Sequence, residues 1–101
     1  MKNASTRPIR LSTQEINAIK AAVASLDAEA RVFLFGSRTD PLQKGGDIDL
    51  LILSKKLQPI DGVKITRKLF ETLEEQKIDI LIASEILDPF VKIAFETGRE
   101  L

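Results

Sequence analysis

Three short runs of β-forming apolar residues alternate with longer segments of helical periodicity, and this order constrains the fold more than any other feature. The runs are Val32 to Phe35, Ile48 to Leu53 and Ile78 to Ile82, and apolar runs of this length predict buried strands. Strands that alternate with helices predict helices packed on a sheet. We therefore expect an α/β (α+β) fold with a small mixed sheet of three to four strands flanked by helices.

Helical segments fill the spaces between these runs. Ser12-Thr13-Gln14-Glu15 has the spacing of a capping box, and apolar residues recur after it at helical intervals. Further along the chain, Asp can cap a helix, Pro suits its first position and Gly suits its end. The expected helices are residues 12–26, Asp61 (as cap) to about Gln76, and a last helix from Asp88-Pro89 to Gly98.

The composition excludes several kinds of site. The chain of 101 residues contains no Cys and no His, so it lacks disulfides, thiolate metal sites and the commonest zinc ligand. Any metal ion must then be held by oxygen ligands, which favour Mg²⁺, Mn²⁺ or Ca²⁺. Lys and Arg together number 15, as do Asp and Glu, so the net charge gives no reason to expect direct nucleic-acid binding.

Length and hydropathy indicate one domain over residues 1–101 of a cytoplasmic protein. No segment approaches the roughly 18 apolar residues of a membrane span, so we expect no membrane association. The first ten residues carry three cations and are interpreted as a flexible, solvated tail.

Two carboxylates open the second apolar run. Residues two apart in a strand share a face, so Asp47 and Asp49 point to one side and Ile48 and Leu50 to the other. The third run repeats this pattern with Asp79. If the two strands are neighbours, three carboxylates converge and must take up protons or bind a cation. An isolated Asp-x-Asp is also typical of a turn or cap at a strand entrance.

A magnesium site is the chemistry that such a trio favours. Two carboxylates at i and i+2 can share one ion while each reaches a second, so the pair can bind Mg²⁺, with Mn²⁺ as an alternative. Mg²⁺ suits this arrangement because it keeps several waters and takes further ligands from substrate phosphates.

A Gly-Ser turn closes the first apolar run. A strand that turns through Gly36-Ser37 into a short helix would direct backbone N–H groups and the Ser37 hydroxyl at one point, which suits a phosphate, and Arg38 is an adjacent cation. The same residues also suit a plain strand-to-helix turn, in which Gly permits the backbone angle and Ser caps. Together with the carboxylates they predict an anion site beside a metal site.

In this order and spacing, Gly36-Ser37-Arg38, Asp47-Ile48-Asp49 and Asp79 resemble the motif of the minimal nucleotidyltransferase (MNT) branch of the DNA polymerase beta-like nucleotidyltransferase superfamily, over roughly residues 12–98. The resemblance implies a nucleotidyltransferase fold in which Gly36, Ser37 and Arg38 bind a nucleoside triphosphate. It also implies that Asp47 and Asp49 bind two Mg²⁺ ions, while Asp79 completes the metal site and activates the acceptor hydroxyl.

The resemblance further implies a partner. MNT proteins of this size are often paired with a small helical HEPN-type protein and act as the antitoxin of the pair, in some cases by transferring AMP to a tyrosine of the toxin. We therefore expect Mg²⁺-dependent transfer of a nucleoside monophosphate, AMP from ATP, to such a hydroxyl. The alternatives are a binding module that neutralises the partner by occlusion, and nucleotidylation of a small molecule such as an aminoglycoside. A homo-oligomer is also compatible with the sequence.

Overall fold

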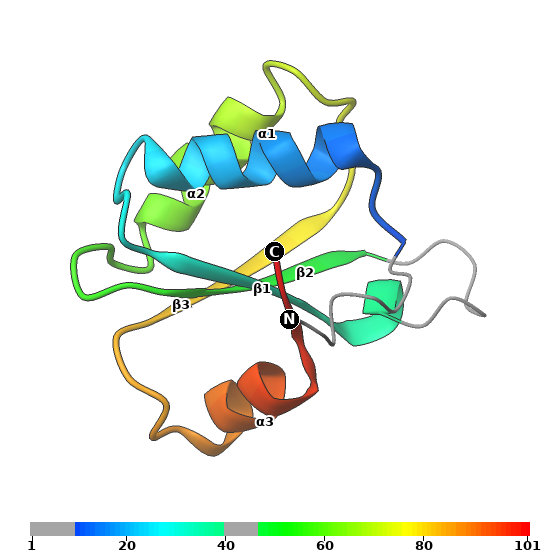
Figure 1. Ribbon diagram of the computed structural model, residues 1–101. Coiled ribbons are helices and arrows are strands. Elements are labelled where there is room, and N and C mark those ends of the chain that lie inside the picture. Colours follow the sequence, from blue (N-terminus) through cyan, green and yellow to red (C-terminus); the bar gives the residue numbers. More distant parts are fainter. Residues whose placement is uncertain (1–9, 40–46) are drawn as a thin grey trace.

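The computed structural model describes residues 10–39 and 47–101 and contains a mixed four-stranded sheet between two layers of helix (Figure 1). β1 pairs antiparallel with both β2 and β4, whereas β2 pairs parallel with β3. The expected mixed α/β sheet is confirmed. Of the ten N-terminal residues predicted to form a flexible tail, residues 1–9 lie outside the described residues. The strand order is β3-β2-β1-β4, with β1 at Arg31–Phe35, β2 at Ile48–Leu53, β3 at Ile78–Ala83 and β4 at Arg99–Glu100.

The sheet separates two apolar cores. Helices α1 (Thr13–Ala24) and α2 (Asp61–Leu69) lie on one face, and α3 (Pro89–Thr97) lies on the other (Figure 1). Because side chains alternate along a strand, each central strand supplies both cores. The core under α1 and α2 contains Ile19, Ala22, Val23, Val32, Leu34, Ile48, Leu50, Ile52, Ile65 and Leu69, and the core under α3 contains Phe33, Leu51, Val91 and Ala94.

The caps confirm the predicted starts of α1 and α3. The Ser12 hydroxyl accepts a hydrogen bond from the Glu15 N–H at 3.0 Å, and the Glu15 carboxylate accepts one from the Ser12 N–H at 2.9 Å. Asp88 caps α3 by accepting from the Phe90 N–H at 2.8 Å, and Gly98 ends that helix as predicted. These bonds satisfy N–H groups that have no partner within a helix.

The predicted start of the second helix is wrong in its cap. Ile60 occupies the cap position without a side-chain hydrogen bond, and Asp61 is the first helical residue. The Asp61 carboxylate instead accepts from the Gln58 N–H at 2.8 Å, one turn earlier. An acidic residue in the first turn still matches the helix dipole. Asp61 therefore does mark the start of this helix, but it lies one position later than the predicted cap.

The predicted end of this helix is also wrong, because α2 stops at Leu69 rather than near Gln76. Residues 71–75 contain three Glu, and anions at a helix C-terminus are disfavoured by the dipole. The observed last turn carries Arg67 and Lys68, which match the dipole. Charge at the helix end therefore outweighs the apolar periodicity that continues beyond it.

The sequence pattern did not predict strand β4. Its two residues pair with β1, with Glu100 opposite Phe33 and Arg99 opposite Leu34. The Glu100 carboxylate accepts two hydrogen bonds of 2.9 Å from the Arg31 guanidinium. These side chains are about half exposed, so the pair fixes the position of the strand more than it adds stability.

None of the helices within residues 10–39 and 47–101 has the length and apolar character of a bilayer-spanning helix.

Ser54 is the buried polar side chain of the described part of the chain, with 5% of its surface exposed. Its hydroxyl donates to the Asp27 carboxylate at 2.6 Å and accepts from the N–H groups of Lys56 at 3.0 Å and Leu57 at 2.8 Å. This hydroxyl, followed by the Glu29 N–H, lowers the pKa of Asp27. Ser54 therefore joins the turn between α1 and β1 to the chain that leaves β2.

We expect Ser54→Ala to lower the free energy of unfolding by about 1–3 kcal/mol, because two backbone N–H groups lose their acceptor. Urea unfolding at neutral pH measures this loss, with exposed Ser84→Ala as the control. Folding lowers the pKa of Asp27, so the ionised Asp27 adds to the free energy of unfolding at pH values above the ordinary Asp pKa. This addition is lost as the pH falls through the pKa of Asp27 in the folded protein. This pH-dependent part of the stability should be smaller in Ser54→Ala than in wild type. Equal stability of Ser54→Ala and Ser84→Ala would contradict the structural role given to Ser54.

Candidate active site

The parallel register of β2 and β3 places Asp49 directly beside Asp79. Each is the second residue of its strand, and neighbouring strands lie about 4.8 Å apart. Both side chains point to the face that α3 covers, because Leu51 and Leu81, two residues further along each strand, belong to the core under α3. The sequence left open whether the two strands are neighbours; they are, and their pairing brings these two carboxylates together.

Asp49 is the electrostatically strained member of the pair. It is half-buried, whereas Asp79 is exposed. Burial raises the pKa of Asp49, and the carboxylates of Asp79 and Asp47 raise it further, while Lys77 lowers it. The side chains of Asp49 and Asp79 are within hydrogen-bonding reach. A proton or a cation between them would relieve the repulsion.

Asp47 lies just before β2 and forms an ion pair with Lys77, with 3.6 Å between the carboxylate oxygen and Nζ. The sequence analysis did not single out Lys77. A signal existed, because Lys77 precedes β3 as Asp47 precedes β2, and the parallel register sets Ile48 beside Ile78. The pair is exposed, at 68% for Lys77 and 44% for Asp47, so it is weak enough for a divalent ion to replace.

Gly36 lies against Asp49. β1 ends at Phe35, which is opposite Asp49 in the antiparallel register, and the short 3₁₀ helix η2 (Gly36–Thr39) follows. Gly36 has φ +79°, which other residues adopt only at a cost, and a Cβ at this position would overlap Oδ2 of Asp49. The predicted strand-to-helix turn is confirmed, and its glycine leaves the space that the carboxylate occupies.

Ser37 and Arg38 follow within η2. The Arg38 guanidinium donates to the Arg10 carbonyl at 2.7 Å and to Oε1 of Gln76 at 3.5 Å. The Arg10 N–H donates in return to the Arg38 carbonyl at 2.8 Å. These bonds tie three segments together beside the carboxylates, and a role of Ser37 and Arg38 in nucleotide binding stays a prediction. Residues 40–46, which connect η2 to Asp47 and include Gly45-Gly46, lie outside the described residues.

An aromatic surface adjoins the site, and its residues were not among those predicted for the site. Phe35, opposite Asp49, contacts Phe90 edge to face with 6.1 Å between ring centroids. Phe90 and Ile93 are each 57% exposed on α3. Exposed aromatic rings stack on nucleobases. The signal in the sequence was an aromatic residue in the first turn of the last helix. The antiparallel pairing that sets Phe35 opposite Asp49, and the contact of Phe90 with Phe35, were not predictable.

The donor set of the site fits Mg²⁺ or Mn²⁺. Within residues 10–39 and 47–101 no three acidic side chains form a ready-made metal site. Mg²⁺ does not require one, since it is commonly bound through one or two carboxylates, several waters and substrate phosphates. Asp49 and Asp79 supply adjacent oxygen ligands with unrelieved repulsion, and Asp47 is held nearby by a weak ion pair.

We expect Asp49→Asn to raise the melting temperature in the presence of a chelator. Because folding raises the pKa of Asp49, its deprotonation costs stability as the pH rises through the folded-state value. The gain should be largest near neutral pH and shrink on acidification below the ordinary Asp pKa. Calorimetry across this range measures it. A melting temperature below that of the wild type at neutral pH would show that Asp49 serves as a structural turn residue.

We expect Gly36→Ala to lower the free energy of unfolding by at least about 1–2 kcal/mol, because Ala is strained at this backbone angle and its Cβ displaces the Asp49 carboxylate. The matched control is Gly62→Ala in α2, where a Cβ would lie 3.7 Å from Ile80 in ordinary contact. That change should raise stability by about 0.4–1 kcal/mol. Chemical denaturation compares the two, and equal effects would contradict the close approach at Gly36.

Comparison with known proteins agrees with this geometry. The family model described as nucleotidyltransferase domain matches residues 16–101, which include the Gly36 turn and all three aspartates. No curated protein gives a significant match. The fold, a small mixed sheet with helices on both faces, is that of a nucleotidyltransferase. The chain therefore belongs to the nucleotidyltransferase domain family.

Proposed function

We propose that this protein transfers a nucleoside monophosphate, AMP from ATP, to a hydroxyl group in a Mg²⁺-dependent reaction. We further propose that the acceptor is a tyrosine of a helical HEPN-type toxin and that the modification makes the protein an antitoxin. Family membership supports nucleotidyl transfer in general. The observation that carries the proposal is the side-by-side placement of Asp49 and Asp79 beneath the Gly36 turn.

Each site residue has a proposed role. Gly36, Ser37 and Arg38 bind the triphosphate, while Asp47, Asp49 and Asp79 hold two Mg²⁺ ions. Bound Mg²⁺ would neutralise the charge that develops on the phosphate oxygens. The acceptor hydroxyl forms a bond to the α-phosphorus, the bond from that phosphorus to the β-phosphate oxygen breaks, and pyrophosphate leaves. The hydroxyl proton passes to Asp79, whose exposed side chain an external acceptor can reach.

The acceptor tyrosine must come from another protein, because this chain contains no Tyr. The site is open on the side where a partner would approach. α3 packs on β1 and β2, Asp79 on β3 is exposed, and Phe35, which lies opposite Asp49, contacts the exposed ring of Phe90. These features favour a macromolecular acceptor over a small molecule enclosed in a pocket.

Neutralisation by occlusion is the alternative function. It would use helix surfaces and would not require the aspartates. The raised pKa of Asp49 favours the enzyme, because crowding carboxylates at one strand end has no evident value for a protein that only binds. An aminoglycoside or similar small acceptor fits the chemistry equally well, but such an acceptor would need an enclosing pocket at the carboxylates.

The test is incubation of the protein and a HEPN-type partner with Mg²⁺ and labelled ATP, GTP, CTP or UTP, followed by intact-mass analysis. We expect the partner to gain one or more AMP units on tyrosine. The double variant Asp47→Asn/Asp49→Asn should still bind the partner, yet add nucleotide at least about 10³-fold more slowly, because transition-state stabilisation worth several kcal/mol is lost. Glu29→Gln/Glu96→Gln, which removes the same charge from exposed positions, is the matched control.

Other outcomes assign the function differently. If the double variant neutralises the partner as fully as wild type at equal concentration, the protein acts by occlusion. If only a small-molecule acceptor gains mass, the HEPN-type partner is wrong and nucleotidyl transfer stands. Loss of transfer in chelator and its return with Mg²⁺ or Mn²⁺ would support the metal assignment independently of the acceptor.

A further inference from the structure

Strand β3 forms one edge of the sheet, and half of its backbone groups have no strand beside them in the described part of the chain. The carbonyls of Lys77 and Ala83 accept hydrogen bonds from the side of β2. Backbone groups of alternate residues point to opposite sides of a strand, so the N–H and C=O groups of Ile78, Ile80 and Ile82 face outward. An edge of this kind is a template for another strand.

Among the residues that the structure describes, none gives β3 the usual protections of an edge strand. Natural edges are blunted by Pro, Lys, bulges or short length, whereas β3 is six residues long with the sequence Ile-Asp-Ile-Leu-Ile-Ala. Its single charge, Asp79, belongs to the candidate active site. All of its residues except Asp79 are half-buried rather than buried, so the strand is apolar and open.

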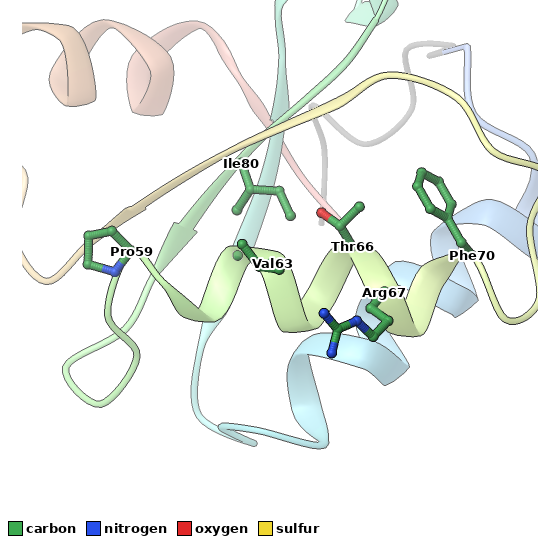
Figure 2. A pocket seen from close by; sticks show the side chains of 7 residues that line it. Pro59, Val63, Thr66, Arg67, Phe70 and Ile80 are labelled. Carbon is green, nitrogen blue, oxygen red and sulfur yellow. The ribbon is translucent and has the colours of Figure 1, made fainter.

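A groove of about 490 Å³ continues from this edge beneath α2. Figure 2 shows its walls: Ile80 from β3 faces Val63 and Thr66 of α2, and Phe70, the residue after α2, closes one end. Val63 is 54% exposed. The side chains of a strand added beside β3 would point into this groove from the same face as Ile80, because paired residues of neighbouring strands share a face.

We propose that a second copy of this chain occupies the edge, with the two β3 strands antiparallel about a two-fold axis at Leu81. In this register Lys77 lies opposite Glu85 of the second copy, and Ile80 lies opposite Ile82. The outward backbone groups of Ile80 and Ile82 then pair directly. Ile82 of the second copy enters the groove beside Ile80.

The charges select this register among those that the backbone allows. An axis at Ile82 would set Asp79 opposite Glu85, with like charges facing each other, and an axis at Ile80 would set Lys77 opposite Ala83 with no charge partner. Opposite charges across a strand pair stabilise it and like charges destabilise it. Lys77 and Glu85 are both exposed, and the ion pair of Lys77 with Asp47 is exposed and weak, so Lys77 can exchange it for a pair with Glu85.

Self-pairing fits better than pairing with an unrelated strand because the edge is complementary to itself. A two-fold axis places Lys77, at the start of the edge in one copy, opposite Glu85, at the end of the edge in the other copy. The same operation repeats the ion pair on both sides of the axis. This interface does not depend on the proposed function. The second copy adds to the edge of the sheet and does not cover the face on which α3 lies.

The first test is sedimentation equilibrium in chelator across the micromolar range. We expect a concentration-dependent dimer, weakened at least about tenfold by Lys77→Glu or by Glu85→Lys, because each creates two facing like charges. The double variant Lys77→Glu/Glu85→Lys should restore the dimer, which a misfolded variant could not do. Lys92→Glu, an exposed charge reversal on α3, is the control and should leave the dimer unchanged.

The second test reads the register by disulfide formation, since the chain has no Cys of its own. Leu81→Cys should cross-link two copies on oxidation, because a residue opposite itself in a non-hydrogen-bonded pair lies within disulfide distance. Ile80→Cys should not cross-link. Four results would each overturn the proposal. The first two are a monomer at all concentrations and an edge of β3 that is protected only in a complex with another protein. The other two are unaltered dimerisation in both single charge variants and cross-linking of Ile80→Cys instead of Leu81→Cys.

Discussion

Burial of β2 on both faces is the constraint on which the rest of the structure depends. Ile48, Leu50 and Ile52 supply the core under α1 and α2, Leu51 supplies the core under α3, and all four are fully buried. Each such side chain contributes about 1.5–3 kcal/mol through burial. The same strand carries Asp49, so the central element of the sheet also holds a carboxylate whose pKa is raised by burial.

This coupling explains why the site can exist in so small a protein. Crowding of Asp49 against Asp79 costs stability, and the positive φ of Gly36 is tolerated only because the residue is glycine. Asp49 cannot move away, since β2 is paired with both β1 and β3, and Gly36 directly follows Phe35, the last paired residue of β1. The sheet fixes the repelling groups in place, and a rigid arrangement of this kind is what binding a cation and a phosphate requires.

The sequence predicted what depends on local pattern. Periodicity located three strands and three helices, and alternation within each strand placed Asp49 and Asp79 on one face. It could not give the end of α2, where the charges of residues 71–75 override the apolar pattern, nor the position of β4, whose two residues are held by pairing with β1. Lys77 and Phe90 reach the site only through strand register and helix docking, and such long-range contacts leave little trace in local sequence.

The open side of the site and the open edge of the sheet meet at β3, yet they make different demands on it. The proposed catalysis uses the face of the strand that bears Asp79, whereas the proposed self-pairing uses the backbone groups in the plane of the sheet. In the register fixed by Lys77 and Glu85, the residue opposite Asp79 is Ala83 of the second copy, whose methyl group is too short to cover the carboxylate. An added strand would therefore leave Asp79 accessible from the α3 face. The dimer and a large acceptor can thus use the same strand at the same time.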